Sequence, residues 1–122
     1  MPKTLLLVDD DEDLLAALTA FLSKNGYAVI TAPTGEEGLK VARERRPDLL
    51  VLDVRMPGMS GYALCAALKQ EDQTFDTPVI FLSGHGEAGD MLRGYYAGAH
   101  DYLVKPVDKD DLLRKIAHLI GS

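Results

Sequence analysis

The sequence predicts an α/β fold in which five parallel strands form one sheet covered by helices on both faces. Five apolar runs alternate along the 122 residues with segments of helical character. Three of these runs are nearly continuous in Leu, Val and Ile, which is typical of strands buried on both faces. Alternation of this kind, joined by right-handed crossovers, produces a doubly wound parallel sheet, here in a single domain of residues 1–122.

The five expected strands are short and evenly distributed along the chain. The second run alternates with small or polar residues, so we expect it to be an edge strand. In chain order, the expected strands are Thr4–Val8, Tyr27–Thr31, Asp48–Asp53, Pro78–Ser83 and Asp101–Lys105.

Capping signals and apolar spacing predict the helices between these strands. The acidic residues 11–13 are expected to serve the N-terminus of the first helix, and Thr34 and Glu37 form a capping box for the second. The segment 87–97 is the weakest and most mobile helix expected, because each of its glycines costs on the order of 1 kcal/mol in a helix interior. Apolar positions and stops define the others: Leu14, Leu18 and Leu22 before Gly26, Leu64 and Leu68 in the third, and Leu112, Ile116 and Ile120 after the cap Asp108.

Composition excludes several classes of function. The net charge of −6 argues against a nucleic-acid-binding surface, which needs clustered Lys and Arg. The one cysteine, Cys65, rules out an internal disulfide and fits a reducing cytosol. No apolar run approaches the roughly 20 residues that span a bilayer, and no secretory signal begins the chain. We therefore expect a cytoplasmic protein that binds neither nucleic acid nor membrane directly.

Polar side chains follow the carboxyl ends of four expected strands. The first strand ends at Asp9 and Asp10, the third at Asp53, the fourth at Ser83 and the fifth at Lys105. Ligands of doubly wound sheets bind at this edge. Three nearby carboxylates raise one another's pKa unless a cation is present, and donors that are all oxygen suit Mg²⁺. With an ammonium and a hydroxyl beside them, they suit phosphoryl transfer to a carboxylate nucleophile, for which Asp53 is best placed.

Four segments give the sequence a resemblance to a known family. "LLLVDDDE", "PDLLVLDVRMPGMSG", "TPVIFLSG" and "GAHDYLVKP" resemble, in order and over essentially the whole chain, the receiver domain of bacterial two-component response regulators. The resemblance implies the flavodoxin-like strand order 2-1-3-4-5. It further implies that Asp53 accepts a phosphoryl group from a kinase phosphohistidine and that Asp9 and Asp10 hold Mg²⁺. A domain of this kind is a signalling module that catalyses only its own phosphorylation and dephosphorylation.

The same resemblance assigns the remaining roles. It implies that the backbone carbonyl of Arg55 completes the metal site, that Lys105 is the family's invariant lysine, and that the Lys105–Pro106 peptide bond is cis. Ser83 matches the switch hydroxyl and Tyr102 the switch aromatic residue.

The resemblance also implies partners for the domain. They are a sensor histidine kinase or phosphotransfer protein, and an output domain or downstream protein reached through the face of the fourth helix, fifth strand and fifth helix. A phosphorylation-dependent dimer is compatible with it. Arg55 and His85 stand at positions where family members vary, so we hypothesise that they tune how fast water attacks the acyl phosphate.

Three other functions share part of this residue pattern. An aspartyl phosphatase of the haloacid dehalogenase type needs a second carboxylate two residues after its nucleophile, where this chain has Arg55. A flavin carrier needs a phosphate cradle after the first strand, where "DDDE" would repel phosphate without a metal. A degenerate receiver that binds partners without phosphorylation remains an alternative, against which the complete set of five residues speaks.

Overall fold

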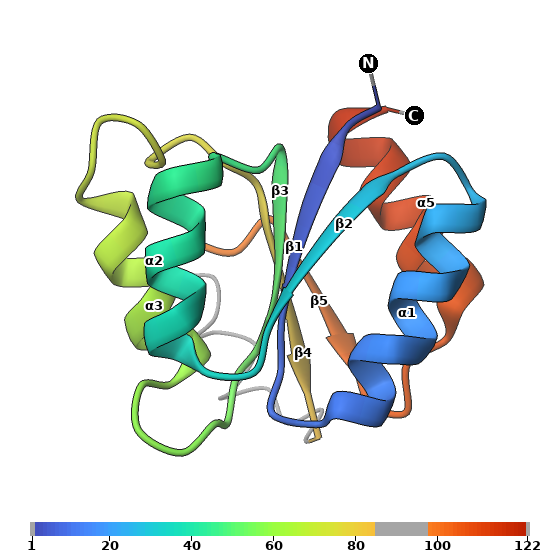
Figure 1. Cartoon of the computed structure of the whole chain (residues 1–122), viewed down its shortest axis with the longest axis horizontal. Helices are drawn as coiled ribbons and strands as arrows, with labels where there is room; N and C mark the ends of the chain where they lie inside the picture. The colour runs from blue at the N-terminus through green and yellow to red at the C-terminus, as the bar shows by residue number, and fades with distance from the viewer. Residues whose placement is uncertain (1, 85–97, 122) are drawn as a thin grey trace.

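The computed structural model describes residues 2–84 and 98–121, in which five parallel strands form one sheet (Figure 1). The strand order is β2-β1-β3-β4-β5, so the predicted order and the predicted edge position of the second strand are confirmed. The strands are β1 (Thr4–Val8), β2 (Ala28–Ala32), β3 (Leu49–Asp53), β4 (Val79–Ser83) and β5 (Asp101–Val104).

Each helix of the described ranges begins at a side chain that caps its first turn. The Thr34 hydroxyl accepts a hydrogen bond from the Glu37 amide at 3.1 Å, and Asp11, Ser60 and Asp108 accept equivalent bonds. The expected helix at 87–97 lies outside the described residues. The helices are α1 (Glu12–Lys24), α2 (Gly35–Arg45), α3 (Gly61–Lys69) and α5 (Lys109–Ile120). Within residues 2–84 and 98–121, none of them combines the length and apolar character of a membrane-crossing helix.

The sheet separates two apolar cores. Figure 1 shows α2 and α3 on one face of the sheet and α1 and α5 on the other. Side chains alternate across β1, so Leu6 and Val8 face α2 and α3, whereas Leu5 and Leu7 face α1 and α5. Because both faces are covered, β1, β3 and β4 are buried along almost their full length. Cys65 packs inside the α2–α3 core, where burial raises the pKa of its thiol to about 11.

Five strand boundaries differ by one residue from the sequence prediction: β2 begins and ends one residue later, β3 and β4 begin one residue later, and β5 ends one residue earlier. β2 begins at Ala28, since the amide of Tyr27 donates to the Leu22 carbonyl of α1 at 3.2 Å. The Tyr27 ring packs in the α1–α5 core, where its hydroxyl donates to the Gly121 carbonyl at 2.8 Å. β5 ends at Val104, one residue before Lys105. The amide of Ala28 donates to the Lys3 carbonyl at 2.9 Å, so residues 27 and 28 hold both ends of the described chain at one edge of the sheet.

Candidate functional site

Three carboxylates meet at the carboxyl edge of the sheet. Asp9, Asp10 and Asp53 each offer one oxygen, and these oxygens all lie within 4.8 Å of one another. The register explains this proximity, since Val8 at the end of β1 pairs with Leu52 of β3 and the acidic residues follow directly. Asp9 and Asp53 are buried, with relative exposures of 1% and 4%, whereas Asp10 is exposed. The sequence prediction that these side chains converge is therefore met by their geometry.

The two oxygens of Asp9 have different surroundings. Oδ1 accepts a hydrogen bond from the Asp11 amide at 2.9 Å. Oδ2 is buried and makes no well-directed hydrogen bond, and its close polar neighbour is the ammonium of Lys105 at 2.9 Å. This contact is an ion pair, so Oδ2 keeps acceptor capacity for a further cation.

Lys105 reaches the acidic cluster from the end of β5. Its amide donates to the Ser83 carbonyl at 2.7 Å, and the Lys105–Pro106 peptide bond is cis. Its Nζ lies 2.9 Å from Asp9 Oδ2 and 3.5 Å from Asp53 Oδ1. Burial alone would lower the pKa of Lys105, but the two carboxylates outweigh burial and hold this pKa above its ordinary value. The ammonium is therefore charged and bridges β1 and β3.

Asp53 is an ionised carboxylate in unfavourable surroundings. Burial, and then the charge of Asp9, raise its pKa from 3.8 to about 6. Lys105 and a hydrogen bond from the Arg55 backbone N–H act in the opposite direction. At neutral pH the carboxylate carries its charge at a free-energy cost, which a bound cation would relieve.

Ser83 and Tyr102 lie on the neighbouring strands β4 and β5. Ser83 ends β4 and is 1% exposed, one strand away from Asp53. Tyr102 pairs with Phe81 in the register of β4 and β5, and its ring is packed in the α2–α3 core. Strand alternation places both side chains on the face of the sheet that Phe81 occupies.

Of the two residues expected to tune dephosphorylation, the structure describes Arg55 but not His85. Arg55 is exposed and lies in the loop that follows Asp53. His85 lies outside the described residues.

Gly61, for which the sequence predicts no role, packs directly against the backbone of Asp53 and Val54. Its amide donates to the Val54 carbonyl at 3.0 Å. A Cβ at this position would collide with the backbone carbonyl of Asp53, so only glycine lets α3 start this close to β3. The signal in the sequence is the glycine directly after the helix cap Ser60, which becomes meaningful only once the tertiary contact is known.

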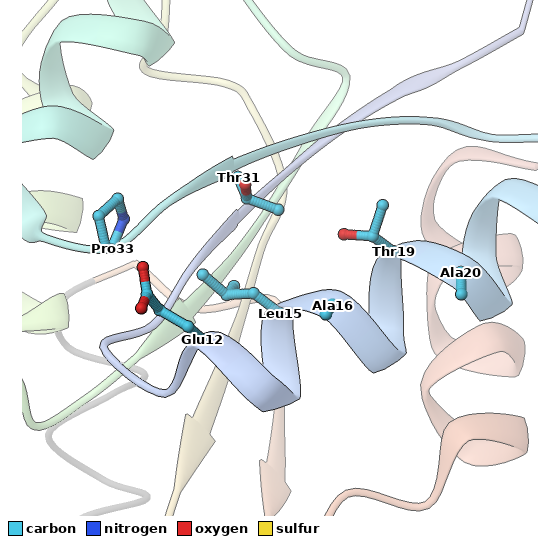
Figure 2. Close-up of a pocket in the computed structure, with 7 residues that line it drawn as sticks. All are labelled: Glu12, Leu15, Ala16, Thr19, Ala20, Thr31 and Pro33. Atoms are coloured by element: carbon cyan, nitrogen blue, oxygen red, sulfur yellow. The ribbon is translucent and has the colours of Figure 1, made fainter.

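A hollow of about 520 Å³ lies between α1 and β2 (Figure 2). Its lining is mostly apolar, and the Thr19 hydroxyl within it is buried without a hydrogen-bond partner. It contains none of the residues of the acidic cluster, so the hollow and the cluster are separate features. The lining residues are Glu12, Leu15, Ala16, Thr19, Ala20, Thr31 and Pro33.

Comparisons with known sequences point to one family. The model of the response regulator receiver domain matches residues 5–117. The transcriptional regulatory protein AfsQ1 of Streptomyces coelicolor is 45% identical over 107 residues, covering 88% of this chain and 46% of that protein. Protein PilH of Pseudomonas aeruginosa is 38% identical over 118 residues, covering 97% of this chain and 98% of PilH. The chain thus spans about half the length of the transcriptional regulators it matches and nearly all of PilH.

Solved structures agree with this result. Chemotaxis protein CheY4 of Vibrio cholerae superposes with a TM-score of 0.93 at 30% identity, over 98% of this chain and 99% of that chain. The receiver domain of the sensor histidine kinase PA1611 of Pseudomonas aeruginosa superposes with a TM-score of 0.91 at 29% identity over 100% of both chains. The PA1611 structure has a magnesium ion coordinated in its active site cleft.

Proposed function

The chain belongs to the response regulator receiver domain family, and we propose that it is a phosphorylation-controlled switch whose phosphoryl acceptor is Asp53. One observation carries the proposal. The Lys105 ammonium lies 2.9 Å from Asp9 and 3.5 Å from Asp53, within a cluster whose third member is Asp10. Such a group of carboxylates and one cation at the carboxyl edge of a parallel sheet is suited to receive a phosphoryl group.

The acidic cluster fits a magnesium ion. Its donors are oxygens only, they lie within 4.8 Å of one another, and the buried Asp9 Oδ2 has acceptor capacity left over. We propose that Asp9, Asp10 and Asp53, together with the Arg55 backbone carbonyl, hold Mg²⁺. When bound, the ion supplies positive charge that neutralises the oxygens of the incoming phosphoryl group.

The chain's own residues perform the transfer in this proposal. The Asp53 carboxylate attacks the phosphorus of a phosphohistidine on a histidine kinase or phosphotransfer protein. A P–O bond forms to Asp53, the P–N bond breaks, and the imidazole leaves with the bonding electron pair. Lys105 stands beside Asp53 and pairs with a phosphoryl oxygen, while the Ser83 hydroxyl donates to another. Asp9 holds the ammonium in place through the shorter of the two ion pairs.

The switch then proceeds from the phosphoryl group to the surface. We propose that Ser83 moves toward the acyl phosphate and that the Tyr102 ring, now 7% exposed, turns to fill the vacated space. This change reshapes the surface of β5, α5 and the segment 87–97, of which the last lies outside the described residues. Phosphorylation then biases an existing equilibrium, with a coupling free energy of roughly 1–3 kcal/mol.

For the output of the switch, the relatives suggest two proposals, which depend on the length of the whole protein. AfsQ1 is a transcriptional regulatory protein more than twice the length of the matched region, whereas PilH is matched almost completely. In a longer protein, the reshaped surface would control an attached output domain, including one that binds nucleic acid. In a protein of PilH's length, it would bind a separate partner.

We further propose that Arg55 and His85 set the lifetime of the acyl phosphate. Arg55 is exposed two residues beyond the acceptor, and the sequence places His85 two residues beyond Ser83. Measurement of dephosphorylation for Arg55→Ala and His85→Ala tests this idea. Unchanged rates in both variants would contradict it.

Incubation with acetyl phosphate and Mg²⁺, followed by intact-mass measurement, tests the proposed function. The expected result is one phosphoryl adduct that disappears in Asp53→Asn and after chelation of the metal. Asp72→Asn is a matched control, because this exposed carboxylate has no described partner, and it should keep the adduct. No adduct would contradict the proposal and favour a degenerate receiver, while continuous release of phosphate from phosphate esters would favour an aspartyl phosphatase.

A further inference from the structure

We propose that Glu36 is a positioning residue that fixes the loop after the phosphoryl acceptor from the neighbouring helix. The loop comprises residues 54–60 and is called here the acceptor loop. Glu36 stands in the first turn of α2, on a different element from every residue of the acidic cluster. The inference rests on the proposed function, because it holds that the position of this loop matters for metal binding at the Asp53 site.

The contact between Glu36 and the acceptor loop is polar and close. Glu36 Oε1 accepts a hydrogen bond from the Met59 amide at 3.2 Å. The other oxygen, Oε2, lies so near Gly58 that a Cβ at this glycine would be 3.0 Å from it. Gly58 has a φ of 79°, in the left-handed region that favours glycine. The Glu36 carboxylate therefore contacts the turn of the acceptor loop at Gly58 and Met59, where the missing side chain of Gly58 leaves room for it.

Gly35, the first residue of α2, allows the same contact because it has no side chain. A Cβ at Gly35 would lie 2.7 Å from the Met59 carbonyl oxygen and 2.8 Å from the Met59 Cβ. Only a residue without a side chain lets the helix approach the loop this closely. Gly35 and Glu36 thus act together, one by allowing the approach and the other by accepting the Met59 amide.

The two flanks of the acceptor loop are held by other contacts. The Val54 amide donates to the Leu82 carbonyl of β4 at 2.9 Å, and the Gly61 amide donates to the Val54 carbonyl at 3.0 Å. The part of the loop between these anchors contains Arg55, whose backbone N–H bonds the Asp53 carboxylate and whose carbonyl is the proposed metal ligand. Glu36 is a side-chain tether to this intervening part, so its loss should let the loop shift relative to Asp53.

A simpler role for Glu36 is that of a favourable charge at the N-terminus of α2, where Glu37 also stands. The two roles differ in what they require of the side chain. A charge partner needs the negative charge but no particular acceptor, whereas the tether needs an oxygen at the Met59 amide. Glu36→Gln retains that oxygen and removes the charge, and Glu36→Ala removes both.

The experiment measures two quantities in the full chain: hydrogen exchange of the Met59 amide without metal, and Mg²⁺ affinity by calorimetry. For Glu36→Ala we expect exchange about tenfold faster and Mg²⁺ binding about tenfold weaker, as for the loss of one charge-assisted bond that supports a metal site. Glu36→Gln should stay within about threefold of the wild type in both, because the acceptor remains. Glu44→Ala, an exposed residue of the same helix with no described partner, should match the wild type.

Three results would overturn the inference. The first is a Met59 exchange rate in Glu36→Ala equal to that of the wild type. The second is faster exchange with unchanged Mg²⁺ affinity, and the third is a Glu36→Gln variant as impaired as Glu36→Ala, which would assign the effect to charge. If the wild type itself binds no Mg²⁺, the proposed function fails at the metal site, and the exchange measurement alone then decides whether the tether exists.

Discussion

Replacing Asp53 by asparagine should stabilise the metal-free protein at neutral and alkaline pH, although it removes the proposed phosphoryl acceptor. Asparagine has nearly the shape of the aspartate side chain but carries no charge. The native carboxylate is buried beside Asp9, and the ion pair with Lys105 only partly compensates. The substitution therefore removes the repulsion between the carboxylates of Asp53 and Asp9 and the cost of burying the charge of Asp53.

The shift in pKa sets the magnitude of this effect. The pKa of Asp53 is about 6 in the folded protein against an ordinary value of 3.8. At roughly 1.4 kcal/mol per unit, a shift of this size corresponds to at most about 3 kcal/mol. Because the site opens to solvent at Asp10 and Lys105, screening reduces our expected gain to about 1–2 kcal/mol.

The pH dependence follows from the direction of the shift. A carboxyl group whose pKa is raised by folding contributes stability that is fully present below its unfolded pKa and is lost as pH rises through its folded pKa. The wild type should therefore lose stability between about pH 4 and pH 6 because of Asp53, whereas asparagine does not titrate. The gap between the two proteins should open across this window and stay constant above it.

Urea unfolding followed by circular dichroism, with chelator present, measures the effect at pH 8 and pH 4.5. We expect Asp53→Asn to raise the unfolding free energy at pH 8 by about 1–2 kcal/mol, or about 3–8 °C in Tm, and by less at pH 4.5. Asp72→Asn should differ from the wild type by less than about 0.5 kcal/mol at both values. Addition of Mg²⁺ should close the gap by stabilising the wild type.

Two outcomes would refute this reasoning. If Asp53→Asn is no more stable than the wild type at pH 8, then Lys105 compensates the buried charge fully. If the gap is the same at pH 8 and pH 4.5, then the stabilisation has a cause other than the titration of Asp53.

The remaining predictions concern the surroundings of the site and one helix end. Lys105→Met should lower the unfolding free energy at pH 8 by about 2 kcal/mol, because Asp9 and Asp53 lose their shared cation, and Mg²⁺ should restore most of the loss; no change in urea unfolding would contradict this. Gly61→Ala should cost about 3 kcal/mol in the same assay by collision with the Asp53 carbonyl, and an unaffected midpoint would show that α3 moves freely. Arg46→Gly should raise Tm, with a gain of about 1 kcal/mol, because Arg46 caps α2 with a φ of 44°; a lowered Tm would contradict it.

Local patterns were sufficient to predict the sheet and the residues at its carboxyl edge. Continuous apolar runs identify β1, β3 and β4, and the residues directly after them are Asp9, Asp53 and Ser83. The strand order and individual residue roles came from the family resemblance and not from these patterns. The start of β2 was misplaced by one residue because Tyr27 continues the apolar pattern of the strand, whereas its backbone amide is bound to the Leu22 carbonyl of α1.

The supporting contacts of the site could not be predicted in this way. Glu36 looks like an ordinary acidic residue in a first helical turn, and Gly61 like an ordinary residue after a cap. Their importance depends on the distance of α2 from Met59 and of α3 from the Asp53 carbonyl. These distances are set by packing between elements, for which neither apolar spacing nor capping signals carry information.

The anchoring of both ends of the described chain at residues 27 and 28 has a practical consequence for biosensor design. Lys3 and Gly121 are held at the edge where the strands begin, opposite the edge that carries Asp9, Asp53 and Lys105. An affinity tag at either end could therefore attach the protein to a chip with its acidic cluster facing the solution. The proposed kinase docking and the proposed metal binding could then both be tested on the same immobilised molecules.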